Sequence, residues 1–236
     1  MYAIALTSIP PRLPRLGPVL ESLLAQRPAP ARVILCLPRV WRRFPGAAPE
    51  LPYLPAGVET LRLDDDLGPA CKALGPAPLL AGQIERLIYC DDDWLMPPGW
   101  AAALLAARGA GEAVAASGFS MARLKRETQN RPGFVDIAQG FSGVLVDPAW
   151  LCGVGMVPPR AARAVDDIWL SGQLARQGVP IRLASRARAG LVPAFSDAHA
   201  LQKARIDGRA RREVNLGCAD LLTRRYGLWP PQPGRG

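Results

Sequence analysis

The chain has 236 residues, a formal net charge of +9, and an apolar share of 49%. This length suits one sizeable domain, and the apolar share excludes a disordered chain. No apolar run approaches the roughly 20 residues of a membrane-spanning helix, and the N-terminus lacks the regions of a signal peptide. Five widely spaced cysteines without a C-x-x-C pair argue against a disulfide framework or a zinc ribbon and favour a reduced, cytosolic protein.

The first part of the sequence predicts strands alternating with a helix. Residues 16–26 carry one apolar helical face, formed by Val19, Leu20, Leu23 and Leu24. Apolar runs rich in Val, Ile and Leu predict buried strands at residues 2–7, 32–37, 58–63 and 86–90. A strand, a helix and a second strand in this order predict a βαβ unit with a parallel sheet.

The second part is less regular. A helix is expected after Pro98, over residues 100–108, with Gly109 closing it. Residues 166–178 predict a helix with an aspartate cap and a glycine at its end. Strands are expected at 113–119, 140–147 and 179–185, with a polar loop at 120–133. A polar, basic tail is expected from residue 197, and its last residues, 229–236, are expected to be loose. We therefore expect a single mixed α/β domain.

Three acidic clusters follow predicted strands or open a predicted helix. They are residues 64–66, 91–93 and 166–167, all aspartates. Ligands of open α/β sheets bind at the carboxyl ends of the strands, where the first two clusters would lie. The alternative is structural, because aspartate is also common in turns and at helix N-caps.

The cluster at 91–93 comes directly after a buried strand. In an extended segment Asp91 and Asp93 point to one side, while Asp92 points away, as a turn or solvent residue. Such a pair can hold a hard divalent cation that takes its other ligands from water and substrate phosphates. A metal and the many arginines would then bind one diphosphate together.

Four segments in order resemble glycosyltransferases with the GT-A fold, most closely the bacterial family 2 type. They are T-S-I-P-P at 7–11, D-x-G-P-A-x-K at 66–72, I-Y-C-D-D-D at 88–93 and D-D-I-W-L-S-G-Q-L-A-R-Q-G at 166–178. The resemblance covers about residues 2–185. It implies an α/β, GT-A-like nucleotide-binding fold with a mostly parallel, mixed central sheet flanked by helices. Residues 1–95 would form the nucleotide-sugar half, 96–196 the acceptor half, and 197–236 a basic tail.

The resemblance also implies roles for single residues. Lys72 would lie near the pyrophosphate, and one of Asp64, Asp65 and Asp66 would face the base or ribose. The donor, linked to UDP or GDP, would contact Thr7, Ser8, Pro10, Asp64, Asp66, Lys72, Asp91 and Asp92. Mn²⁺ or Mg²⁺ would be held by Asp91, Asp93 and His199. His199 is the only histidine, and its alternative role is an ordinary surface residue.

On the acceptor side, which would receive a glycan or a lipid-linked molecule, the resemblance points to Gln139 and Gly140. Trp169, beside the candidate base, is the tryptophan that would stack on an acceptor sugar, and its alternative role is a core or rim residue. Asp166 and Asp167 occupy the place of a Glu-Asp pair that supplies the catalytic base in inverting members. Asp167, near a helix N-terminus, would be kept ionised by the helix dipole. The aspartate at the first position leaves open which of the two is the base.

Two other functions stay open. A nucleotidyltransferase also joins nucleotide phosphates to metal-bound carboxylates, but no Gly-rich, basic loop follows the first strand. A non-catalytic protein could use the arginines of the last quarter to bind nucleic acid or an anionic surface, although no nucleic-acid motif is present. The same arginines are candidates for peripheral contact with the inner membrane surface. A degenerate transferase that keeps nucleotide binding without turnover is the remaining alternative.

Overall fold

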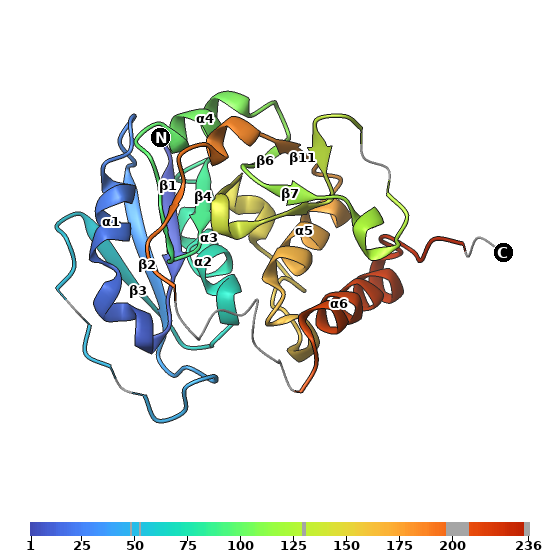
Figure 1. The fold of residues 1–236 in the computed structure, drawn as a ribbon, viewed down its shortest axis with the longest axis horizontal. Coiled ribbons are helices and arrows are strands. Elements are labelled where there is room, and N and C mark those ends of the chain that lie inside the picture. The colour runs from blue at the N-terminus through green and yellow to red at the C-terminus, as the bar shows by residue number, and fades with distance from the viewer. Residues whose placement is uncertain (48, 52, 129–130, 197–207, 234–236) are drawn as a thin grey trace.

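The computed structural model describes residues 1–47, 49–51, 53–128, 131–196 and 208–233 (Figure 1). Within these residues, the main sheet has eight strands in the order β3-β2-β1-β4-β10-β6-β11-β8. Their bounds are β1 Ala3–Thr7, β2 Arg32–Pro38, β3 Val58–Leu63, β4 Leu87–Cys90, β6 Ala113–Ala115, β8 Phe134–Val135, β10 Val144–Val146 and β11 Ile181–Leu183. Two short pairs join β5 Trp94–Leu95 to β12 Val192–Pro193, and β7 Gly118–Phe119 to β9 Ile137–Ala138.

The sheet is parallel on its N-terminal side and mixed beyond it. β1 pairs in parallel with β2 and β4, and β2 with β3. β10 runs antiparallel to both β4 and β6. The start of β10 therefore lies beside the end of β4, which brings residues 140–143 close to the aspartates after Cys90. The predicted mixed sheet is confirmed.

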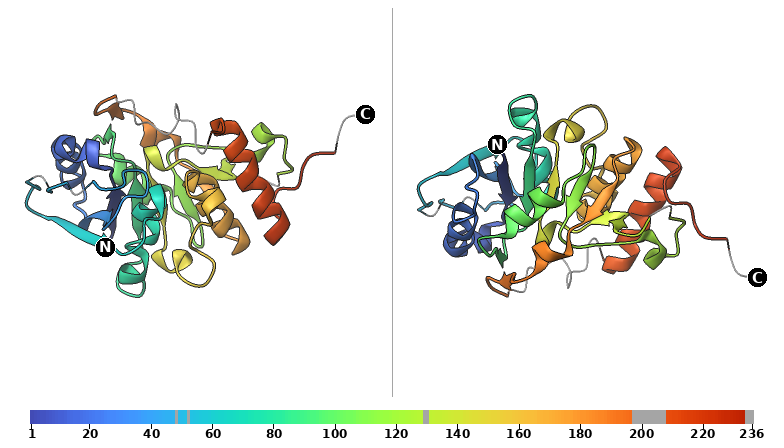
Figure 2. Two further views of the ribbon diagram at one scale, coloured as in Figure 1. Left: turned by 90° about the horizontal axis from the view of Figure 1, so that it is seen from below. Right: turned by 90° about the horizontal axis from the view of Figure 1, so that it is seen from above.

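Helices cover both faces of the sheet (Figures 1 and 2). Along β1, Ile4 and Leu6 pack into the core that includes helices α1 and α4, whereas Ala3 and Ala5 pack into the core on the opposite face. The α-helices are α1 Gly17–Leu24, α2 Cys71–Leu74, α3 Ala77–Leu80, α4 Trp100–Ala107, α5 Asp166–Arg176 and α6 Arg211–Tyr226. The 3₁₀ helices are η1 Pro10–Arg15, η2 Gly68–Ala70, η3 Met121–Leu124, η4 Gly140–Ser142, η5 Pro148–Leu151, η6 Arg160–Ala162 and η7 Ser185–Arg188. No helix within the described residues is both long and apolar enough to cross a membrane.

Several predicted elements are present but shorter. The strand predicted at 140–147 begins only at Val144, because residues 140–142 form η4 and Gly143 has a left-handed φ of 99°. The strand predicted at 113–119 is split into β6 and β7. The helix predicted at 100–108 ends at Ala107.

The C-terminal region contains a helix that the sequence did not predict. Helix α6 lies against α5 (Figure 1), and its Val214, Cys218 and Leu222 enter the core. Trp229, in the segment expected to be loose, is also buried. Val214, Cys218 and Leu222 recur every four positions, and only Ala219 joins them in the core, so the apolar stripe of α6 is narrow and the sequence resembles a basic tail.

Candidate active site

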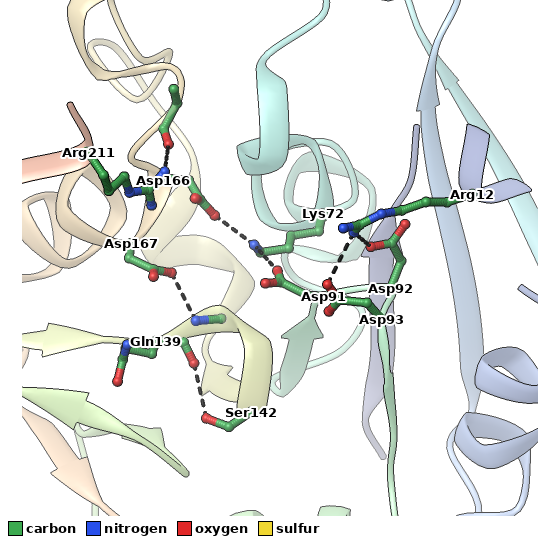
Figure 3. A network of polar contacts seen from close by, with 12 residues as sticks. Arg12, Lys72, Asp91, Asp92, Asp93, Gln139, Ser142, Asp166, Asp167 and Arg211 are labelled. Atoms are coloured by element: carbon green, nitrogen blue, oxygen red, sulfur yellow. Dashed lines mark hydrogen bonds and ion pairs between the residues drawn. The ribbon is translucent and has the colours of Figure 1, made fainter. Parts of the chain in front are cut away.

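The three aspartates after β4 point in different directions (Figure 3). Asp91 accepts a hydrogen bond from Lys72 Nζ at 2.6 Å. Asp92 accepts hydrogen bonds from Ser8 Oγ and from Arg12 Nη1, both at 2.5 Å, and is only 4% exposed. The expectation that Asp92 is a turn or solvent residue is therefore wrong: its carboxylate anchors the loop after β1 beneath the site.

Asp93 has the features of a cation ligand. Its Oδ2 lies 3.3 Å from Arg12 Nη1, whereas its Oδ1 is buried without a hydrogen-bond partner among the described residues. Burial, reinforced by the charges of Asp91 and Asp92, raises the pKa of Asp93 to about 7. A buried acceptor without a donor is rare in folded proteins, and a bound cation would satisfy it.

A divalent metal would need further ligands from outside the protein. No group of three or more His, Cys, Asp or Glu side chains is arranged to hold an ion in the part of the chain described. Asp93 Oδ1 and the second oxygen of Asp91 fit the mode in which Mg²⁺ or Mn²⁺ uses one or two carboxylates plus water and phosphate oxygens. His199, the third predicted ligand, lies outside the described residues.

Lys72 is the centre of a buried ionic network (Figure 3). Its side chain is 1% exposed, and its ammonium lies 2.6 Å from Asp91 and 2.7 Å from Asp166. Burial by itself would lower the pKa of Lys72, but the nearby carboxylates outweigh it and the pKa rises. The ammonium predicted to lie near the pyrophosphate is therefore already paired, and it ties the end of β4 to helix α5.

The two aspartates of α5 occupy its first turn but do not cap it. The N-cap is Val165, and no side chain caps the helix, so the predicted aspartate cap is wrong, whereas Gly178, with φ of 71°, ends the helix as expected. Asp166 is buried against Lys72, whereas Asp167 is half-buried and accepts a hydrogen bond from Gly140 N at 2.9 Å. Burial, followed by the charge of Asp166, raises the pKa of Asp167. The expectation that the helix dipole determines the ionisation of Asp167 is therefore wrong. A raised pKa suits a general base working near neutral pH.

Gly140 has to be a glycine in this arrangement. A Cβ at this position would lie 2.8 Å from Lys72 Nζ and 3.3 Å from Asp167 Oδ1. The missing side chain lets the backbone amide of Gly140 hold Asp167 while Lys72 passes beside it. Gln139, the other predicted acceptor residue, is half-exposed on the same turn (Figure 3).

The remaining predicted residues lie at the same edge of the sheet but differ in exposure. Thr7 Oγ1 donates to the carbonyl of Cys36, and Pro10 opens η1. Asp64 forms an exposed ion pair with Arg39, whereas Asp66 accepts a hydrogen bond from Gly68 N at 2.8 Å and shapes the turn before Lys72.

The predicted role of Trp169 in stacking on an acceptor sugar is wrong. Trp169 is 0% exposed, and its indole N–H donates to the carbonyl of Met156 at 2.7 Å, so its ring cannot stack on a ligand. Arg12 was missed, although its position five residues after β1 places it at the same sheet edge as the aspartates.

Comparisons with known proteins give a fold but no family. No model of a known protein family matches the sequence, and no curated protein matches it. Glucosyl-3-phosphoglycerate synthase from Mycobacterium tuberculosis, in a complex with Mn²⁺, UDP-glucose and phosphoglyceric acid, is similar in structure: its TM-score is 0.57 at 12% identity, over 100% of this chain and 81% of that one. A second mycobacterial protein has the same TM-score and identity, over 100% of this chain and 76% of that one.

A galactosyltransferase in complex with donor and acceptor sugar analogues has a TM-score of 0.40 at 11% identity, over 63% of this chain and 58% of that enzyme. The present chain thus spans just over half of that galactosyltransferase. The predicted GT-A-like fold is confirmed by the mixed sheet and by the likeness to the synthase.

Proposed function

We propose that this protein is a glycosyltransferase that moves a sugar from a nucleotide-diphosphate donor to an acceptor hydroxyl with the help of a divalent metal. The observation that carries the proposal is the buried Oδ1 of Asp93 at the carboxyl end of β4, which no described residue satisfies with a hydrogen bond. Support comes from the similarly folded synthase, which holds Mn²⁺ and UDP-glucose. The donor is accordingly expected to be UDP-linked, with a GDP-linked sugar as the second choice.

The chain's own residues supply two separate chemical tasks. Asp93 and Asp91 would hold the ion, which when bound neutralises charge on the leaving diphosphate. Asp167 would accept the proton of the acceptor hydroxyl as that oxygen attacks the anomeric carbon. We propose that the hydroxyl attacks from the face opposite the leaving diphosphate, so that its bond to the anomeric carbon forms as the bond to the diphosphate breaks and the anomeric configuration is inverted.

Nucleotide binding tests the proposal most directly. We expect calorimetry to show that UDP binds in the presence of Mn²⁺ and much more weakly without it, and that Asp93→Ala removes the metal dependence. The control is Glu85→Ala, because Glu85 is an exposed carboxylate near the opposite end of β4. Absence of binding to both UDP and GDP, or binding that is indifferent to Mn²⁺ and to Asp93, would contradict the proposal.

Contact with an anionic membrane surface is a further proposal for α6, as one way to reach a lipid-linked acceptor. Its Arg212, Arg224 and Arg225 are exposed, and such charges attract anionic lipids. At low salt the protein should co-sediment with phosphatidylglycerol vesicles. Replacing the three arginines by glutamine should abolish this co-sedimentation. Equal sedimentation of both proteins would refute it.

A further inference from the structure

The turn at residues 139–143 is fixed at both of its ends. Gly140 is held by its hydrogen bond to Asp167 and by close packing against Lys72. At the other end, Trp100 Nε1 donates to the carbonyl of Ser142 at 2.7 Å. A Cβ at Gly143 would come within 2.3 Å of the Trp100 ring, so the turn packs tightly against α4. Its backbone is thus a rigid support.

This rigid turn presents two half-exposed side chains, Gln139 and Phe141, whereas Gly140, Ser142 and Gly143 are buried. The backbone N–H of Gln139 donates to the carbonyl of Ser117, and its carbonyl accepts from Ser142. Its side-chain amide makes no hydrogen bond to any described residue, and this group can both donate and accept. Phe141 belongs to neither hydrophobic core. Its ring instead lies 5.2 Å from the ring of Trp94, tilted by 43°.

The Trp94 side of this aromatic pair (Trp94 and Phe141) is also held in place. Strand β5 pairs with β12, and Ala194 N donates to the carbonyl of Asp93 at 2.8 Å. Helix η7, which precedes β12, lies near the aromatic pair. The guanidinium carbon of its Arg188 is 5.5 Å from the centre of the Phe141 ring. Arg188 is exposed and forms no ion pair with a described carboxylate.

The aromatic pair adjoins both halves of the candidate active site. Trp94 follows Asp93, the candidate metal ligand, and Phe141 follows Gly140, whose amide holds the candidate base Asp167. A ring resting on Phe141 would therefore lie between the donor phosphates and the base, where an acceptor has to be.

We propose that the aromatic pair, Gln139 and Arg188 form the acceptor subsite, and that the acceptor is a sugar ring carrying an anionic group. The apolar C–H face of a sugar packs on an aromatic ring, and the amide of Gln139 serves its hydroxyls. Arg188, whose guanidinium lies over the Phe141 ring, favours a carboxylate or a phosphate over a neutral substituent. The identity of the acceptor class rests on the proposed transferase function.

The test compares three probes that share one ring. Methyl β-glucoside is neutral, methyl β-glucuronide carries a carboxylate, and glucose 6-phosphate carries a phosphate. Saturation-transfer NMR titrations are made on the whole protein with UDP and Mn²⁺ present. We expect at least one acidic probe to bind about fivefold or more tightly than the glucoside, and the two acidic probes distinguish carboxylate from phosphate.

Variants separate the two parts of the subsite. Phe141→Ala should weaken all three probes about fivefold or more, whereas Arg188→Gln should remove only the preference for the acidic ones. Arg186→Gln is the matched control, because Arg186 is exposed on the same η7, whereas the cation–π contact with Phe141 comes from Arg188. UDP affinity should stay within about twofold of wild type in all three variants.

The outcomes keep this inference distinct from the proposed function. UDP binding without any preference for the acidic probes, or an equal effect of Arg186→Gln and Arg188→Gln, overturns the acceptor subsite alone. Loss of UDP binding in the wild-type protein overturns the transferase proposal itself.

Discussion

Replacing Lys72 by methionine tests whether this lysine holds the site together. Met keeps the length of the side chain but removes the ammonium that lies 2.7 Å from Asp166 and 2.6 Å from Asp91. The side chain of Asp166 is 6% exposed, and leaving such a carboxylate unpaired costs about 3–5 kcal/mol. Asp91 is 35% exposed, so its share of the loss is below about 1 kcal/mol.

The free energy of unfolding should therefore fall by about 3–5 kcal/mol in Lys72→Met. In a domain of this size each kcal/mol lowers Tm by about 2–4 °C, so the expected drop in Tm is about 6–20 °C. Urea unfolding followed by circular dichroism measures the free energy, and scanning calorimetry measures Tm.

A double variant distinguishes an unpaired charge from lost packing. In Lys72→Met with Asp166→Asn no unpaired charge remains from that pair, so this protein should be more stable than Lys72→Met alone by about 2 kcal/mol or more. The reasoning is refuted if Lys72→Met unfolds within about 1 kcal/mol of wild type while its UDP affinity falls more than tenfold. Lys72 would then serve the diphosphate, as the resemblance to glycosyltransferases implies.

Three further predictions concern the reacting groups and their support. Asp167→Asn should abolish transfer while UDP affinity stays within a few-fold, and the same loss in Asp166→Asn with full activity in Asp167→Asn would move the base to Asp166. Because burial raises the pKa of Asp93 to about 7, protons compete with the metal below that pH. Mn²⁺ affinity, measured by electron paramagnetic resonance, should thus weaken by up to about tenfold per pH unit below 7 and level off above it, with no such slope in Asp93→Asn. Gly140→Ala should lower the free energy of unfolding by about 1–3 kcal/mol, because the added Cβ forces Lys72 and Asp167 apart. Gly217→Ala, which points into open space on α6, should raise it by about 0.5–1 kcal/mol. Equal stability of the two variants in urea unfolding would contradict this.

The edge of the sheet that carries the site could be predicted, because it depends on local patterns. Apolar runs fixed where β1 and β4 end, and the parallel order placed Ser8 and the aspartates after β4 at one edge. The partners of these groups depend on packing between distant segments. Lys72 and Asp166 are 94 positions apart, and Arg12 and Asp92 are 80 apart, so no local pattern connects them.

The same limit explains the wrong role for Trp169. The sequence places Trp169 two positions after Asp167, but which face of α5 looks toward the site depends on the neighbours of the helix. Helix α6 was not predicted. Without α6, one apolar face of α5 has no neighbour to pack against and can be mistaken for a face that binds a ligand. With α6 in place, the sides of α5 are buried and its first turn alone reaches the site.

The charges of the site are unbalanced in a way that favours a cationic ligand. In the part of the site that the described residues form, Lys72 faces Asp91, Asp166 and Asp167, and Arg12 faces Asp92 and Asp93, so these two cations meet five carboxylates. Burial, reinforced by neighbouring carboxylates, raises the pKa values of three of these groups, Asp92, Asp93 and Asp167. A divalent ion at Asp93 would supply the missing positive charge and lower the cost of ionising Asp93 and Asp167. Binding of the metal would thereby also help to keep Asp167, the proposed base, ionised, so the proposed donor and acceptor sides of the site would be coupled through charge.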